Sequence, residues 1–218
     1  MAVTGSDVLA NRSTTTIKLV VDRTVGRLRW DRAAFFPQDG DRLLPTATLS
    51  VRVIRSARLT LRVLDASGTV VRTAWNGRAF AAGTAAWRWD GCTGTGAWAP
   101  PGRYVAELVA TSSLGTTTLR SAIRAEAFLV IGAPRASAAG GTATIVFRTV
   151  EPLARRPTVR LALAGRAPVA GAVNLLADGS YRAVVSVPAG YAGPASFVIT
   201  GRDRLGGANQ ARVAVTIR

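Results

Sequence analysis

The strongest constraint in this sequence is an alternation of apolar and polar residues with a period of two. Residues 46–53 show it clearly, with apolar side chains at Ala47, Leu49, Val51 and Val53. Successive side chains of a β-strand point to opposite faces, so the pattern predicts half-buried strands. The same alternation is found in residues 57–64, 85–89, 103–110, 116–124, 143–149, 158–163, 181–187, 196–200 and 211–218. Turn residues separate these stretches, and none has helical spacing. The sequence therefore predicts an all-β fold of tandem antiparallel sandwiches.

An internal repeat indicates how the chain divides. Thr4–Leu9 matches Thr200–Leu205 at four of six positions, 196 residues later. In the same frame, three apolar residues of the first copy fall opposite three of the second: Ile17, Leu19 and Val21 opposite Val213, Val215 and Ile217. That offset is about twice the ~100 residues of a small β-sandwich. We therefore expect residues 1–23 to be the terminal hairpin of a truncated preceding domain, followed by complete domains at 24–131 and 132–218, with a short linker at 130–134.

The composition excludes several function classes. The chain has no histidine and a single cysteine, Cys92, which removes Ser-His and Cys-His catalysis, an intrachain disulfide and the commonest zinc ligands. No apolar run approaches the ~20 residues of a spanning helix, so no membrane span is expected. Basic residues outnumber acidic ones by 28 to 12. This charge could attract an acidic polymer, but the basic side chains are dispersed along the chain, which favours a solvated surface and no specific nucleic-acid partner.

An ordered set of motifs in residues 35–128 carries a family resemblance. The motifs are Phe36–Asp41, Leu59–Thr73, Ala82–Thr84, Trp87–Gly91 and Pro101–Tyr104. Together they resemble the immunoglobulin-like domain named for the flagellar hook-capping protein FlgD and the secreted protease Vpr, although the opening turn departs from the family's Ser-Pro-Asn-Gly-Asp-Gly. Residues 132–218 resemble bacterial immunoglobulin-like repeats more generically. The resemblance implies tandem antiparallel immunoglobulin-like β-sandwiches.

All five tryptophans lie between residues 30 and 98. Trp87 and Trp89 are two residues apart and share a strand face, which favours core packing. Trp30, Trp75 and Trp98 lie near expected loops, so we expect these three to be exposed. Exposed together on one surface, they would be candidate ligand contacts for a glycan.

The acidic residues offer few candidate sites. Asp39-Gly40-Asp41 could begin a calcium site, because a hard cation prefers several oxygen ligands at close spacing. Because no third acid and no bidentate glutamate stand nearby in the sequence, a turn is the favoured interpretation, as it is for Asp7 and Asp203. Glu151 lies near a strand end, and no carboxylate pair marks a cleft. We therefore predict no catalytic, cofactor or metal site.

Three functions are compatible with this sequence. The favoured hypothesis is a non-catalytic structural or interaction module of a larger extracellular or cell-surface bacterial protein, spacing or presenting the other domains of that protein. One alternative is an accessory module of a secreted hydrolase that binds cell-wall polymer or glycan. The other, implied by the family resemblance, is a scaffold for flagellar hook assembly.

Overall fold

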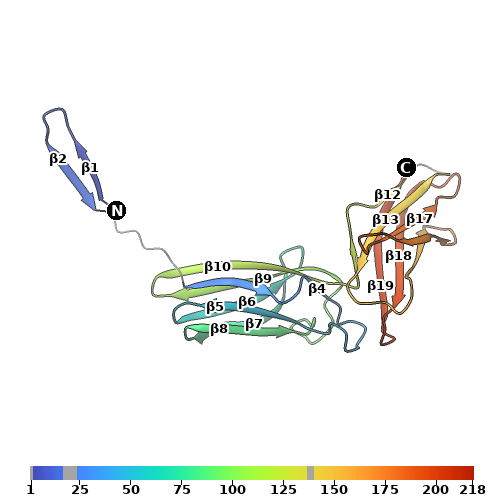
Figure 1. The fold of residues 1–218 in the computed structure, drawn as a ribbon, viewed down its shortest axis with the longest axis horizontal. Coiled ribbons are helices and arrows are strands. Elements are labelled where there is room, and N and C mark those ends of the chain that lie inside the picture. Colours follow the sequence, from blue (N-terminus) through green and yellow to red (C-terminus); the bar gives the residue numbers. More distant parts are fainter. Residues whose placement is uncertain (1, 17–23, 137–139) are drawn as a thin grey trace.

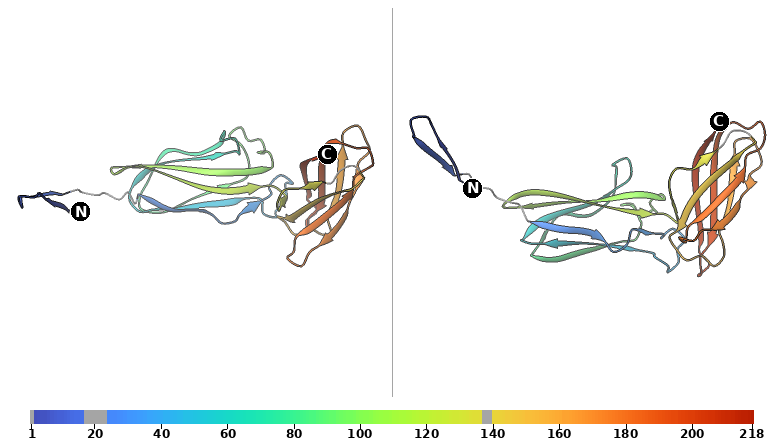
Figure 2. Two further views of the ribbon diagram at one scale, coloured as in Figure 1. Left: turned by 90° about the horizontal axis from the view of Figure 1, so that it is seen from above. Right: turned by 45° about the horizontal axis from the view of Figure 1, so that its top comes forward.

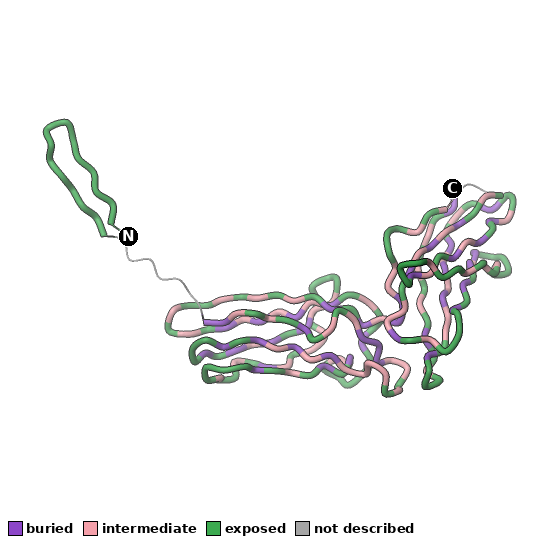
Figure 3. Tube along the Cα trace, in the orientation of Figure 1, coloured by how far each residue is buried: buried purple, intermediate pink, exposed green. Residues whose placement is uncertain are grey.

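The computed structural model describes residues 2–16, 24–136 and 140–218, and all regular structure within them is β-strand and turn. The predicted all-β fold is thereby confirmed. Two strands, β1 (Ala2–Ser6) and β2 (Arg12–Thr16), form an antiparallel hairpin whose residues are all exposed (Figure 3). Within the described residues, these strands pair only with each other. Ile17, Leu19 and Val21 of the sequence repeat lie outside the described residues.

The first sandwich places a three-stranded sheet against a five-stranded sheet (Figure 1). The smaller sheet has the order β3 (Val25–Trp30), β5 (Ala47–Val53) and β8 (Gly83–Trp89). The larger has the order β4 (Ala34–Phe35), β10 (Gly115–Ala125), β9 (Gly102–Ser112), β6 (Ala57–Leu64) and β7 (Val70–Phe80). Burial alternates along β5 and β6 as the sequence predicts, and Trp89 is fully buried between the sheets.

The second sandwich also consists of two sheets. One has the order β11 (Phe128–Val130), β13 (Thr142–Thr149), β17 (Tyr181–Ser186) and β16 (Ala172–Leu175), with β12 (Arg135–Ala136) paired to β13. The other has the order β15 (Val169–Ala170), β14 (Thr158–Leu163), β18 (Gly193–Arg202) and β19 (Ala208–Ile217). Phe147 and Phe197, both fully buried, belong to the core between them.

The two sandwiches meet at a closely packed junction. Ala125 ends the first sandwich, whereas Phe128 already pairs with Thr149 of the second, so the change of domain precedes the boundary expected at residue 131. The segment 130–134 consequently connects two strands of the second sandwich instead of linking the domains. Phe36, which directly follows β4 of the first sandwich, is buried in the second core. The strands of the second sandwich run steeply across the direction of the first (Figures 1 and 2).

Candidate functional site

The junction between the sandwiches gathers acidic side chains from distant parts of the sequence. Asp39 and Asp41 lie in the loop between β4 and β5 of the first sandwich. Glu151 follows β13, and Asp203 lies in the turn between β18 and β19, both in the second sandwich. Glu151 and Asp203 are each only 1% exposed, whereas Asp39 and Asp41 are half-buried. Folding therefore brings together carboxylates that are up to 164 residues apart.

The distances show that these carboxylates converge. One carboxylate oxygen from each of Asp39, Asp41 and Glu151 lies within 4.8 Å of the other two. Asp203 also lies close to this group, because its Oδ2 and the Oδ2 of Asp39 approach the same side of Gly207. A Cβ built on that glycine would stand 2.2 Å from Asp203 Oδ2 and 2.6 Å from Asp39 Oδ2. Carboxylates from both sandwiches therefore face each other across the junction.

One oxygen of each acidic side chain at this junction lacks a hydrogen-bond partner. In the described part of the chain, six side-chain polar atoms are buried without any partner, and all belong to the junction residues or to their sequence neighbour Gln38: Gln38 Oε1, Asp39 Oδ2, Asp41 Oδ2, Glu151 Oε1, Asp203 Oδ2 and Asn209 Oδ1. Asn209 is 1% exposed and donates its amide to Glu151 Oε2 over 3.3 Å, which leaves its own oxygen unused. Buried polar atoms are normally satisfied, so such a concentration needs an explanation.

Local turn chemistry aims each aspartate. Asp203 Oδ1 accepts the backbone N–H groups of Leu205 (2.7 Å) and Gly207 (3.1 Å), and thereby caps the β18–β19 turn while Oδ2 is left over. In the other loop, Asp39 Oδ1 accepts the N–H of Asp41, and Asp41 Oδ1 accepts the N–H of Leu43. Each aspartate uses one oxygen to build its own turn, as aspartates in turns usually do, and presents the other to the junction.

The charges at the junction are mutually unfavourable. Burial, and then the negative charges of Asp39 and Asp41, raise the pKa of Glu151 to about 8. Burial also raises the pKa of Asp39, with a further contribution from the charge of Asp41. For Asp203, burial alone would raise the pKa, but the N–H donors of Leu205 and Gly207, with smaller contributions from the carboxyl groups of Asp39 and Asp41, together leave the pKa lowered. A carboxylate among other carboxylates in a desolvated place favours whatever neutralises it.

The structure brings to Asp39 and Asp41 further acids that their sequence neighbourhood does not contain. Their turn forms as predicted, with Gly40 at a φ of 77°, but Glu151 and Asp203 supply the missing acids from the other sandwich. Sequence spacing gave no signal for this, because the set is completed only when the two domains pack.

The expected exposure of Trp30 and Trp75 was wrong. Trp30 ends β3 and is 9% exposed, with its ring centroid 6.2 Å from that of Trp89 and its indole N–H donated to Ser121 O. Trp75 is 7% exposed because β7 continues beyond it to Phe80, and register shifts against β6 turn it inward. Trp98 is 49% exposed, and its role as a ligand contact stays a prediction.

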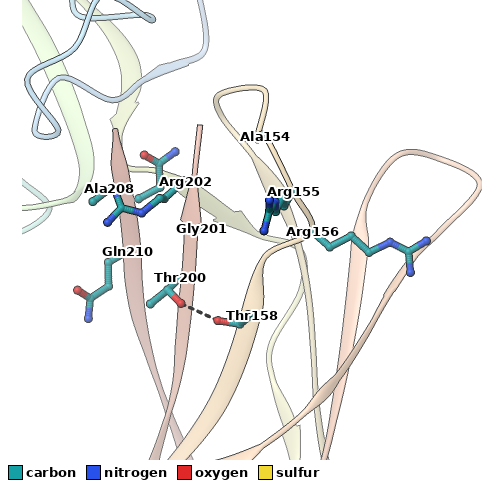
Figure 4. A pocket seen from close by; sticks show the side chains of 10 residues that line it. Ala154, Arg155, Arg156, Thr158, Thr200, Gly201, Arg202, Ala208 and Gln210 are labelled. Atoms are coloured by element: carbon teal, nitrogen blue, oxygen red, sulfur yellow. Dashed lines mark hydrogen bonds between the residues drawn. The ribbon is translucent and has the colours of Figure 1, made fainter. Parts of the chain in front are cut away.

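Two other features offer less. Burial, and then the charge of Asp90, raise the pKa of the Cys92 thiol, which is opposite to what a nucleophilic cysteine requires. A hollow of about 500 Å³ lies over β14, β18 and β19 (Figure 4). It holds Arg155, Arg156 and Arg202, but Figure 4 shows their guanidinium groups spread apart, with Arg156 extended away from the hydrogen-bonded pair Thr158 and Thr200.

Comparison with known proteins agrees with the fold. The FlgD Ig-like domain family matches residues 45–113, which confirms the resemblance predicted for this part of the chain. No curated protein matches the chain. A crystal structure of a protein of unknown function from Porphyromonas gingivalis W83 shares 15% identity over 89% of this chain and 100% of that one, with a TM-score of 0.29. Three N-terminal domains of the bacteriophage RB49 Highly Immunogenic Outer Capsid protein share 12% identity over 100% of this chain and 76% of that one, with a TM-score of 0.27.

Such low TM-scores carry no argument about function. The family match shows residues 45–113 to resemble an FlgD Ig-like domain, a type of β-domain that is generally non-catalytic. Among the described residues, no helix is long and apolar enough to cross a membrane. The immunoglobulin-like type expected for residues 132–218 stays a prediction, although the regular structure described in that segment is all β-strand.

Proposed function

We propose that this chain is a non-catalytic spacer module of a larger extracellular or cell-surface bacterial protein, in which it holds other domains at a fixed distance and orientation. The observation that carries the proposal is the packing at the junction. Phe36 leaves the first sandwich and is buried in the core of the second, at 4% exposure. Two sandwiches in series that share a buried side chain cannot swing freely about a linker, and stiffness is what a spacer requires.

Features of the surface support spacing over recognition. Two of the three tryptophans considered for glycan stacking, Trp30 and Trp75, are buried in the core. The arginines of the hollow over β14, β18 and β19 point in different directions, so they do not form a converging site for an acidic polymer. The flagellar scaffold hypothesis rests on the family match alone, and a module type of this kind serves unrelated proteins.

The test is to measure how the two sandwiches move in solution. Backbone ¹⁵N relaxation of residues 24–218 within the whole chain should give one rotational correlation time for both sandwiches, and small-angle X-ray scattering should give an elongated particle. Separate correlation times for the two sandwiches would contradict the proposal. Retention of the purified chain on cell-wall polymer at physiological salt would favour the binding alternative instead.

A further inference from the structure

We propose that the acidic junction is a calcium-binding site, in which Asp39, Asp41 and Glu151 supply carboxylate oxygens and Asp203 and Asn209 are further oxygen donors. The site is built from the three-acid cluster within 4.8 Å and from the unpartnered oxygens of Asp203 and Asn209 beside it. It draws residues from both sandwiches, so a bound ion would be shared between them.

The chemistry of the donors selects the class of metal. All of the unpartnered atoms are oxygens from carboxylates or side-chain amides. The chain has no histidine, and Cys92 is not a member of the cluster, so the nitrogen and sulfur ligands preferred by zinc and copper are missing from it. Calcium takes six to eight oxygen ligands in flexible geometry, whereas magnesium demands a tight octahedron and retains water. A mixed set of carboxylates and an amide from three separate segments suits calcium better.

The distribution of charge gives an independent reason. The chain has 28 basic and 12 acidic residues, and four of those acids meet at this one junction. Ion pairs form elsewhere, between Arg120 and Glu107 for instance, yet within the described ranges none of the four junction carboxylates is paired with an arginine. In a chain with so many arginines, leaving these acids unpaired keeps their oxygens available to a cation.

The three buried donors make this more than a group of surface acids. Glu151, Asp203 and Asn209 are each 1% exposed, and each has an oxygen without any partner. Asp203 Oδ2 and Asp39 Oδ2 converge on the same point beside Gly207, where each acceptor faces another acceptor. Facing acceptors are stable only with a cation or a proton between them. The experiment below separates these two ways of neutralising the site.

The first measurement is calorimetric titration of the whole chain with CaCl₂ after dialysis against EDTA, with MgCl₂ as comparison. We expect saturable calcium binding with a dissociation constant of ~10⁻⁴–10⁻³ M, the range of extracellular calcium-binding modules. Magnesium at 1 mM should not displace calcium that is present at a comparable concentration. Glu151→Gln should weaken calcium binding by ~10–100-fold or more, the loss found even for groups that only support a metal ligand. Glu107→Gln, which removes an acid on β9 away from the cluster, should leave binding unchanged.

The second measurement keeps the proposal falsifiable if a variant loses stability. Calcium should raise the unfolding temperature of the parent chain, and it should raise that of Glu151→Gln much less, because the variant lacks one carboxylate ligand. If protons alone neutralise the junction, the calorimetric titration with CaCl₂ would show no binding, and calcium would not shift the unfolding temperature of the parent chain or of any variant. That result would overturn the proposal.

The calcium proposal adds to the spacer function without depending on it. Calcium binding by a chain whose sandwiches show separate correlation times in EDTA would leave the site intact and refute the spacer. A single correlation time without calcium binding would retain the spacer and refute the site.

Discussion

The hairpins β1–β2 and β18–β19 are two copies of one local structure with different surroundings. Ser6 pairs with Arg12, and Arg202 pairs with Ala208, in the same register 196 residues later. Asp7 caps its turn by accepting the N–H groups of Leu9 and Asn11. Asp203 does the same with Leu205 and Gly207. The sequence repeat therefore corresponds to a shared turn with the same register and the same aspartate cap.

The copies differ in what the second aspartate oxygen does. Asp7 Oδ2 accepts the side-chain amide of Asn11 over 3.0 Å, so this exposed carboxylate is fully used within its own hairpin. The position of Asn11 is occupied by Gly207 in the second copy, and Asp203 Oδ2 is buried without a partner. The comparison shows that the turn is encoded locally, whereas the junction site needs both the loss of one amide and the approach of another domain.

The largest effect should come from removing the packing of one sandwich against the other, which the exposed hairpin β1–β2 lacks. Phe36→Ala deletes a buried aromatic ring from the second core, and such truncations cost ~3–5 kcal/mol. Chemical denaturation of the whole chain measures this, and ¹⁵N relaxation should show the sandwiches moving more independently. Leu175→Ala, at a residue that is 51% exposed, is the matched control. An equal effect of both variants would contradict the importance of this contact.

The next largest effect concerns the aspartate caps of the two hairpins, Asp203 and Asp7. Asp203→Ala leaves two backbone N–H groups without their acceptor beside a buried junction, and should cost ~1–3 kcal/mol in calcium. Asp7→Ala removes the same cap from a hairpin whose residues are all exposed, and should not shift the main unfolding transition. Calorimetry of both variants checks this. A main transition that responds equally to Asp7→Ala would show that the two hairpins are not in different surroundings.

A reciprocal exchange tests the role of the amide. Gly207→Asn should place a Cβ and an amide against Asp203 Oδ2, as Asn11 does for Asp7, and so abolish the calcium-dependent rise in unfolding temperature. In EDTA the substitution itself should cost ~1–3 kcal/mol, because the added Cβ would stand 2.2 Å from Asp203 Oδ2 and 2.6 Å from Asp39 Oδ2, so that these side chains must shift. Gly102→Ala, at a glycine with open space around its Cβ position, is the control. Undiminished calcium stabilisation in Gly207→Asn would separate Asp203 from the site.

The smallest effect concerns a third turn, capped by Asp178, which is exposed like the first hairpin. The hydroxyl and N–H of Ser180, followed by the side chain of Arg148, lower the pKa of Asp178 from 3.8 to about 2. A carboxyl whose pKa is lowered by folding stabilises the folded chain at any pH above its pKa in the unfolded chain. That contribution is lost as the pH falls from about 4 towards 2. Asp178→Asn should therefore unfold slightly earlier than the parent chain at pH 7, and the difference should shrink as the pH falls to 2 and below. A difference that stays equally large at pH 2 would contradict this cause.

Local patterns in the sequence were sufficient to predict most of the longer strands and several turns, but not β3, β4, β11, β12, β15 or β16. The alternation in β5 and β6 corresponds residue by residue to their buried faces, and the Asp turns form where Asp and Gly place them. The burial of Trp75 could not be predicted in the same way, because it depends on register shifts between β6 and β7. The acidic junction could not be predicted either, since its members lie on separate segments that only domain packing brings together.

The most direct test of the account is a crystal structure of the whole chain grown in calcium, with anomalous difference density measured at the junction. The account predicts a peak among the carboxylates of Asp39, Asp41 and Glu151, bonded to oxygens at the ~2.3–2.6 Å typical of calcium. A well-ordered junction without such a peak, in which these carboxylates share protons or pair with arginines, would contradict it.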